Sequence, residues 1–276
     1  MTVPTVTLSD GTEMPGIGTG TAKMNGETLA NTVEAATDVS RTAIDTAEGY
    51  GNEADLGDAV SGYDRSDLFL TSKVCPSNMD YESVLRSCAG SLDRLGTSYL
   101  DLYLVHWPNP AVSLRATLDA MARLRDRGQV RRVGVSNFDV HLLRFARHVS
   151  DVSIVVNQVE FHPYRFRPAL LEYAADADVT LMAAAPLAQG AVFDDETIRS
   201  VAEKHDRSVA QVVLRWEIQH GVVPVPRSST PAHVRANLDV FDWELDETDM
   251  QRIDAIDRRE RTYAIDPRDD TYGIAR

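Results

Sequence analysis

The sequence predicts an α/β protein built as a single (β/α)₈ TIM barrel. Short runs of β-branched and apolar residues alternate with longer stretches whose apolar residues recur at helical spacing, which is typical of parallel strands joined by crossover helices. Eight such runs occupy about 250 residues, the usual length of one barrel. With 276 residues, 43% of them hydrophobic, the chain can bury the core that this fold requires.

The strand and helix patterns follow one another along most of the chain. The predicted strands cover residues 16–19, 43–46, 68–74, 99–107, 133–137, 154–161, 180–186 and 222–225. The predicted helices cover residues 29–39, 81–95, 114–127, 140–148, 169–177, 196–220 and 231–241.

A doubly wound sheet is the structural alternative. It would carry a G-x-G-x-x-G fingerprint after its first strand. Residues 16–21 read Gly-Ile-Gly-Thr-Gly-Thr, with threonine at the position of the last glycine of that fingerprint. No linker, repeat or low-complexity stretch divides the chain. We therefore expect one domain over residues 1–276.

Two segments lie outside the eight units. Residues 5–14 have the pattern of a β-hairpin that turns at Asp10-Gly11, and such a hairpin could close the bottom of the barrel. Residues 246–257 form a further helix pattern that opens with acidic side chains. The tail, residues 258–276, shows no clear period, and we expect it to cover the mouth of the barrel.

Composition limits the partners of the protein. The 42 acidic and 28 basic residues give a net charge of −14, which repels nucleic-acid phosphates. No apolar run is long enough to span a bilayer and no signal-like segment is present, so we expect a cytoplasmic location. Cys75 and Cys88 are too few for a disulfide framework, and we expect no metal site. We also expect a monomer or a weak homodimer.

The acidity has two explanations, a solvated surface and adaptation to a salt-rich cytoplasm in which screening removes the repulsion between aspartates. The second explanation predicts that the free energy of unfolding rises between dilute buffer and molar KCl. Thermal unfolding followed against KCl concentration checks this, and equal stability at both ends of the range would contradict it.

Four polar side chains are predicted at one end of the barrel, where the chemistry of this fold takes place. Asp45 ends the second strand, Tyr50 follows in the next loop, Lys73 ends the third strand and His106 ends the fourth. Each alone has an ordinary structural explanation, as a helix cap, a surface aromatic, a solvated charge or a buried histidine. Their place at the ends of consecutive strands favours a catalytic site.

The chemistry that this set favours is proton transfer to a carbonyl oxygen. A phenol is a weak acid unless a nearby cation stabilises its phenolate, and Lys73 can supply that cation. Asp45 would pair with Lys73 and keep it charged, while His106 would orient the substrate oxygen. No side chain supplies hydride, so a nicotinamide cofactor is required.

Several blocks of the sequence resemble the signatures of the aldo-keto reductase family, in the family's order, from the N-terminal hairpin to about Met250. Agreement among separate motifs is far more specific than any single motif. The blocks are residues 44–53 (IDTAEGYGNE), 71–74 (TSKV), 104–108 (LVHWP), 134–138 (GVSNF) and 157–158 (NQ).

The resemblance implies a reductase of aldehydes or ketones in which Tyr50 is the general acid, Asp45 and Lys73 tune it, and His106 orients the substrate. It also implies a site for NADPH/NADP⁺, and we expect NADPH to be preferred, with appreciable use of NADH. The implied cofactor residues are Thr19, Asp45, Ser136, Asn137, Gln158, Leu187, Gln189, Arg227, Ser228, Thr230, His233 and Asn237.

Within that set the residues are assigned to different parts of the cofactor. Side-chain donors and acceptors at 136, 137 and 158 match the positions that hold the nicotinamide carboxamide. Leu187 and Gln189 match the loop along the pyrophosphate. Arg227 and its neighbours match the segment that binds the adenosine 2′-phosphate, where a guanidinium and hydroxyls at a helix N-terminus suit a phosphate. His233 replaces an arginine that is common there, which favours partial use of NADH.

Three positions depart from the family pattern. Gly20 and Cys75 stand where tryptophan lines the pocket in many members, and Ala184 replaces the aromatic residue that stacks on the nicotinamide. The pocket is therefore expected to be wide, with Trp107 as its clearest aromatic wall. Cys75 is expected to be a small buried residue rather than a reactive one.

The substrate and two other functions stay open at this level. Small aldehydes, α-keto carbonyls and open-chain sugars all suit the site. A non-catalytic NADP-binding barrel, acting as a regulatory or structural subunit, is the alternative to a reductase. A hydrolase using Asp45 and Glu160 ranks lower, because it leaves Tyr50 and Lys73 without a role.

Overall fold

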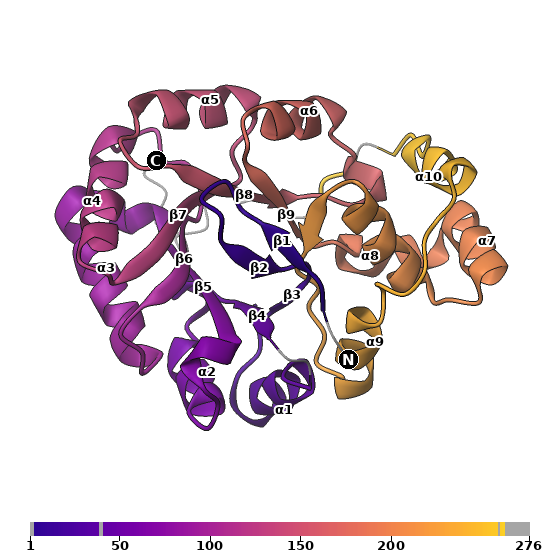
Figure 1. Cartoon of the computed structure of the whole chain (residues 1–276), viewed down its shortest axis with the longest axis horizontal. Coiled ribbons are helices and arrows are strands. Elements are labelled where there is room, and N and C mark those ends of the chain that lie inside the picture. Colours follow the sequence, from indigo (N-terminus) through magenta and orange to yellow (C-terminus); the bar gives the residue numbers. More distant parts are fainter. Residues whose placement is uncertain (1–2, 39–40, 259, 263–276) are drawn as a thin grey trace.

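The computed structural model describes residues 3–38, 41–258 and 260–262, and it shows the predicted (β/α)₈ barrel. Eight parallel strands stand in sequence order around the barrel, with helices on the outside (Figure 1). The strands are β3 (Gly18–Gly20), β4 (Thr42–Asp45), β5 (Leu68–Val74), β6 (Leu100–Val105), β7 (Val130–Ser136), β8 (Ile154–Glu160), β9 (Thr180–Ala184) and β10 (Val222–Pro224).

The first and last strands meet at a seam. β3 and β10 are the two ends of the pairing order of the sheet. The amide of Gly20 donates a hydrogen bond of 2.9 Å to the carbonyl of Pro226, just beyond β10. A Cβ atom at position 20 would lie 3.4 Å from the Val225 carbonyl oxygen. The barrel is thus closed by a backbone contact at a residue without a side chain.

Most of the helices agree with the sequence pattern to within a few residues. Their N-caps explain several of the boundaries, since Asp80, Ser113 and Asp139 each accept a hydrogen bond from a backbone amide of the first turn. The helices in agreement are α1 (Gly26–Ala36), α3 (Tyr81–Arg94), α4 (Leu114–Asp126), α5 (Val140–Val149), α6 (Pro168–Asp176), α9 (Pro231–Leu238) and α10 (Glu247–Asp254).

One predicted helix was wrong, and one helix was missed. The predicted helix 196–220 is two helices, α7 (Glu196–His205) and α8 (Val209–Gln219), because Asp206 turns into the left-handed region at φ +50° and Ser208 starts a new helix with a capping box. The helix α2 (Glu53–Val60) was not predicted. It packs so tightly on the end of α3 that a Cβ at Gly57 would lie 2.4 Å from the Arg94 carbonyl oxygen, so tertiary contact stabilises it.

The N-terminal hairpin is confirmed. β1 (Thr5–Thr7) pairs antiparallel with β2 (Glu13–Pro15), and Gly11 takes a φ of +81° in the turn. Leu8 and Met14 are buried in the cluster that fills the barrel interior, together with residues at the amino ends of the strands. Figure 1 shows the hairpin lying across the opening of the barrel. It therefore closes the end opposite to the predicted site.

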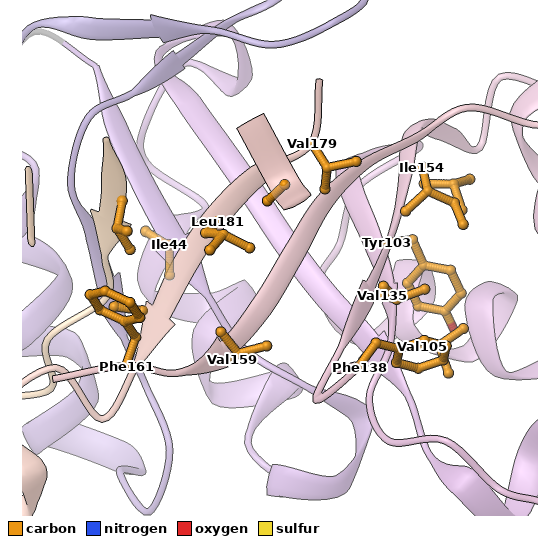
Figure 2. Close-up of a cluster of buried hydrophobic side chains, with 14 of the residues drawn as sticks. Ile44, Tyr103, Val105, Val135, Phe138, Ile154, Val159, Phe161, Val179 and Leu181 are labelled. Carbon is orange, nitrogen blue, oxygen red and sulfur yellow. The ribbon is translucent and has the colours of Figure 1, made fainter. Parts of the chain in front are cut away.

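The core has two layers because side chains alternate along each strand. In β6, Leu102 and Leu104 point into the barrel, whereas Tyr103 and Val105 join the layer between strands and helices. Figure 2 shows part of this outer layer, contributed by strands β4 and β6–β9 and the loops beside them.

Two further expectations concern the chain end and membranes. Most of the tail predicted to cover the mouth, residues 263–276, lies outside the described residues. Within the described part of the chain, no helix has the length and apolar character needed to cross a bilayer.

Gly134 in β7 is predicted to be required for close strand packing. A Cβ there would lie 2.6 Å from Leu104 Cδ2 and 2.7 Å from the Val156 carbonyl oxygen, which forces the backbone to shift. We expect Gly134→Ala to lower the free energy of unfolding by about 1–3 kcal/mol. Gly62→Ala is the matched control, since nothing lies within 4 Å of its added Cβ. Urea unfolding of both variants measures the difference, and equal midpoints would contradict the prediction.

Candidate active site

A buried ion pair lies at the carboxyl end of the barrel. Lys73 Nζ, at 0% exposure, lies 2.5 Å from Asp45 Oδ1 and donates a second hydrogen bond of 2.8 Å to the Thr46 carbonyl. Asp45, at 5% exposure, accepts a bond of 2.7 Å from Gln158 Nε2 on its other oxygen. Strands β4, β5 and β8 thus contribute to one charge-balanced cluster, in which the polar partners offset the cost of removing both charges from water.

Tyr50 stands over this ion pair. It ends a short 3₁₀ helix, Glu48–Tyr50, and its hydroxyl lies 3.4 Å from Lys73 Nζ. The neighbouring Glu48 fastens this turn, because its carboxylate accepts bonds from the Cys75 amide (3.0 Å) and Asn78 Nδ2 (2.7 Å). We did not identify Glu48 from the sequence, and its place two residues before Tyr50 was the available signal.

His106 lies beside Tyr50 with the two rings edge to face, their centres 5.7 Å apart at 77°. It is 5% exposed. Burial, together with the positive charge of Lys73, holds the pKa of His106 well below its usual value. The imidazole is therefore neutral at neutral pH. All four residues of the predicted set are brought together by the fold.

A hydrogen-bond network continues from this cluster to the ends of β7 and β8. The backbone nitrogen of Asn137 donates a hydrogen bond to the backbone carbonyl of Gln158 (2.8 Å). The side-chain Nδ2 of Asn137 donates to the backbone carbonyl of His106 (2.9 Å) and to Ser136 Oγ (3.0 Å). Asn137 has a φ of +66°, a conformation that asparagine tolerates better than most residues. The predicted carboxamide residues Ser136, Asn137 and Gln158 thus form one contiguous group beside His106.

A second group of predicted residues gathers where β3 meets the start of α9. Thr19, Ser228 and Asn237 line a small surface pocket, too narrow for a water molecule, together with Gly18, Pro226, Val234 and Leu238. Arg227 is exposed at its edge and donates a bond of 3.3 Å to the Ala22 carbonyl. Thr230 is the N-cap residue of α9, and His233 lies exposed in the first turn of that helix.

Leu187 and Gln189 lie in the loop after β9, which is strained. Ala185, Ala188 and Gln189 all have positive φ angles, of +48°, +48° and +52°, and each costs about 1 kcal/mol or more. Leu187 packs against the core, whereas Gln189 Nε2 donates a bond of 3.0 Å to the Thr262 carbonyl. The loop is therefore held by packing on one side and by the C-terminal segment on the other.

The predicted substrate residues occupy different positions around the mouth. Trp107 is partly exposed directly after His106, and Gly20 is buried at the seam. Cys75 is 6% exposed. Burial, followed by the negative charge of Glu48, raises the pKa of Cys75 to about 12, so it is a thiol and not a thiolate at neutral pH. Ala184, at the end of β9, is partly exposed. The width of the pocket beside these residues stays a prediction.

Comparison with known proteins identifies the class to which this fold and site belong. Residues 8–258 match the Aldo/keto reductase family, so the chain is a member of that family, whose enzymes reduce carbonyl compounds with NAD(P)H. It is 43% identical to "Glyoxal reductase" of Bacillus subtilis (strain 168) over 260 residues, 93% of this chain and 94% of that protein.

Solved structures agree with this assignment. An aldo/keto reductase from Brucella melitensis is 40% identical and superposes with a TM-score of 0.85, covering 91% of this chain and 98% of the other. A Bombyx mori aldo-keto reductase in complex with NADP is 26% identical with a TM-score of 0.88, covering 96% of each chain.

Proposed function

We propose that this protein is an NADPH-preferring carbonyl reductase, formed by one domain over residues 1–276, in which Tyr50 is the general acid. The observation that carries the proposal is the position of Lys73, whose ammonium lies 2.5 Å from the Asp45 carboxylate and 3.4 Å from the Tyr50 hydroxyl. Asp45 holds the Lys73 ammonium in place and balances its charge, so the ammonium can stabilise a phenolate at Tyr50 without moving into solvent.

His106 would bind and orient the substrate oxygen rather than protonate it. Its lowered pKa keeps the imidazole neutral, and a neutral imidazole can donate one hydrogen bond without carrying a charge that repels Lys73. Because the pKa of His106 is lowered, the imidazole stays neutral as pH falls past 6.5. Its role in orienting the substrate oxygen therefore persists on the acid side of neutrality. Tyr50 is thus the proton donor of the pair.

The residues present fit a nicotinamide cofactor. Ser136, Asn137 and Gln158 offer amide and hydroxyl groups for a carboxamide beside His106, and Asp45 lies in the same network. Gln189 and Leu187 would lie along the pyrophosphate. Bound there, the reduced nicotinamide would supply the hydride that no side chain provides.

The adenosine end of the cofactor is proposed to lie against the surface over the narrow pocket between β3 and α9, not inside that pocket. Its lining includes the hydroxyls of Thr19 and Ser228 and the amide of Asn237. Arg227 at the edge supplies a permanent positive charge for a 2′-phosphate. His233 supplies a second charge only when protonated, which is the reason to expect appreciable activity with NADH.

For the substrate, we propose small aldehydes and α-dicarbonyl compounds. The similarity to a glyoxal reductase over 93% of the chain supports glyoxal as the first compound to assay. The residues at positions 20, 75 and 184 are small and uncharged. The choice of substrate therefore depends on the shape of the pocket and on Trp107 rather than on a charged group.

The two-carboxylate hydrolase loses support from the geometry. Asp45 is bonded to Lys73 and Gln158, and Glu160 accepts bonds from Thr262. Both carboxylates are therefore engaged in other interactions, which argues against their activating a water or attacking a glycosidic carbon. The turnover measurements described below test the other alternative, a non-catalytic NADP-binding barrel.

The first test replaces the proposed acid. We expect Tyr50→Phe to lower kcat for glyoxal reduction by about 10²–10⁴-fold, because the proton donor is lost, and to leave the Kd for NADPH within about twofold. Tyr63→Phe is the control, since Tyr63 is an exposed surface residue at 38%. Steady-state kinetics and cofactor fluorescence measure both. If Tyr50→Phe kept the wild-type turnover, the acid role would be disproved. If the wild-type protein bound NADPH but reduced no compound of a broad carbonyl panel, the non-catalytic alternative would be favoured.

The second test concerns the cofactor. We expect wild type to have a higher kcat/KM with NADPH than with NADH, and Arg227→Ala to raise the KM for NADPH about tenfold while the KM for NADH changes less than twofold. Arg235→Ala on α9 is the control, because Arg235 pairs with Asp38 at 2.5 Å. A wild-type ratio that favours NADH would overturn the proposed preference.

A further inference from the structure

Glu160 holds a distant part of the chain against the mouth of the barrel. It is the last residue of β8 and is 4% exposed. Its Oε1 atom accepts hydrogen bonds from the backbone nitrogen (2.5 Å) and the hydroxyl (2.7 Å) of Thr262, which lies 102 residues further along the chain. A buried carboxylate thus binds two donors of one residue in the C-terminal segment.

The carboxylate is kept charged by its surroundings. His162 Nε2 lies 3.2 Å from Oε1, and Arg165 Nε lies 3.2 Å from Oε2. Burial opposes ionisation, but the hydrogen bonds from His162 and Thr262 outweigh it, so the pKa of Glu160 lies below its usual value. Bonds to a charged acceptor are roughly twice as strong as neutral ones, so Thr262 is held firmly.

The same residue contacts the proposed cofactor loop. The Thr262 carbonyl accepts a hydrogen bond of 3.0 Å from Gln189 Nε2, in the strained loop after β9. A second tie fixes the segment, since the Glu260 amide donates to the carbonyl of the fully buried Tyr164 (3.0 Å). Contacts therefore run without a gap from the end of β8 through Thr262 to Gln189.

We propose that Glu160 is a positioning residue for the cofactor site, which fixes Gln189 through Thr262 and so slows the release of the nicotinamide cofactor. The inference rests on the proposed function, in which Gln189 lies along the pyrophosphate. A primary amide has two donor hydrogens, so Gln189 can keep its bond to Thr262 and still donate to a phosphate oxygen.

The strain in the loop is the physical reason for the coupling. Three residues with positive φ favour relaxation of the loop, and two backbone hydrogen bonds of 2.8 Å inside the loop oppose it. An outside contact adds to these bonds in keeping Gln189 in place. The Thr262 carbonyl provides that contact, and Glu160 keeps the carbonyl where it is. When the anchor is lost, the loop opens more often and the cofactor leaves faster.

The test removes the anchor at its donor side. Thr262→Pro lacks both the amide hydrogen and the hydroxyl that Glu160 binds but keeps the carbonyl, whereas Thr262→Ser keeps both donors and is the matched control. Stopped-flow fluorescence, with bound NADPH chased by excess NADP⁺, measures the dissociation rate constant. We expect it to rise about fivefold to tenfold in Thr262→Pro and to stay within twofold of wild type in Thr262→Ser.

A double variant separates this coupling from a purely structural tie. Thr262→Pro added to Gln189→Ala is expected to change the dissociation rate less than twofold relative to Gln189→Ala alone, because both substitutions break the same path. A merely structural role would lower the thermal midpoint and leave the exchange rate unchanged. Glu160→Gln, which keeps the size and the acceptor but loses the charge, is expected to give a smaller rise in the same direction.

The outcomes distinguish this inference from the proposed function. If wild type does not bind NADPH, the proposed function fails and this inference fails with it. If wild type binds NADPH and both Thr262→Pro and Glu160→Gln release it within twofold of the wild-type rate, the positioning role is wrong while the proposed function stands. Fully additive effects in the double variant would likewise overturn it.

Discussion

The ion pair between Lys73 and Asp45 is the interaction on which the rest of the site depends. Both groups are almost completely removed from water, and each alone would be an uncompensated buried charge whose cost is about 3–5 kcal/mol. The pair is tolerable because the Thr46 carbonyl and Gln158 complete its hydrogen bonds. Asp45, Lys73 and Gln158 come from three strands, β4, β5 and β8, so these strands must be assembled before the charges are balanced. Fold and chemistry are therefore not separable at this point of the molecule.

Local patterns in the sequence predicted the fold well, because the strands of a barrel are short apolar runs separated by helices. The strand 68–74 was predicted without error, since it is buried along its whole length. The break at Asp206 was missed because the apolar period continues on both sides of it. The helix α2 was missed because its stability comes from contact with α3. Such long-range contacts leave little trace in a local pattern.

The site was predictable to the extent that its residues end strands. Asp45, Lys73 and His106 could be placed by that rule, and Tyr50 could be placed in the loop that follows Asp45. The contacts by which Glu48 holds the Cys75 amide and Glu160 holds Thr262 could not be predicted, because these partners lie 27 and 102 residues away and no periodicity links them. Carboxylates that hold loops together look like solvated surface charges until the contacts are known. The residues that hold loops around this candidate site are therefore harder to predict than those at the ends of its strands.

The seam of the barrel has a consequence for stability. The pocket proposed for the adenosine end is lined on one side by Gly18 and Thr19 of β3 and on the other by Pro226, which follows β10. A molecule bound over these residues would touch both ends of the sheet and hold the seam together. Whatever binds only the closed barrel adds its binding free energy to folding, in proportion to the logarithm of its concentration. Binding of the proposed cofactor at this seam would make the thermal stability of the protein depend on the supply of that molecule as well as on the sequence.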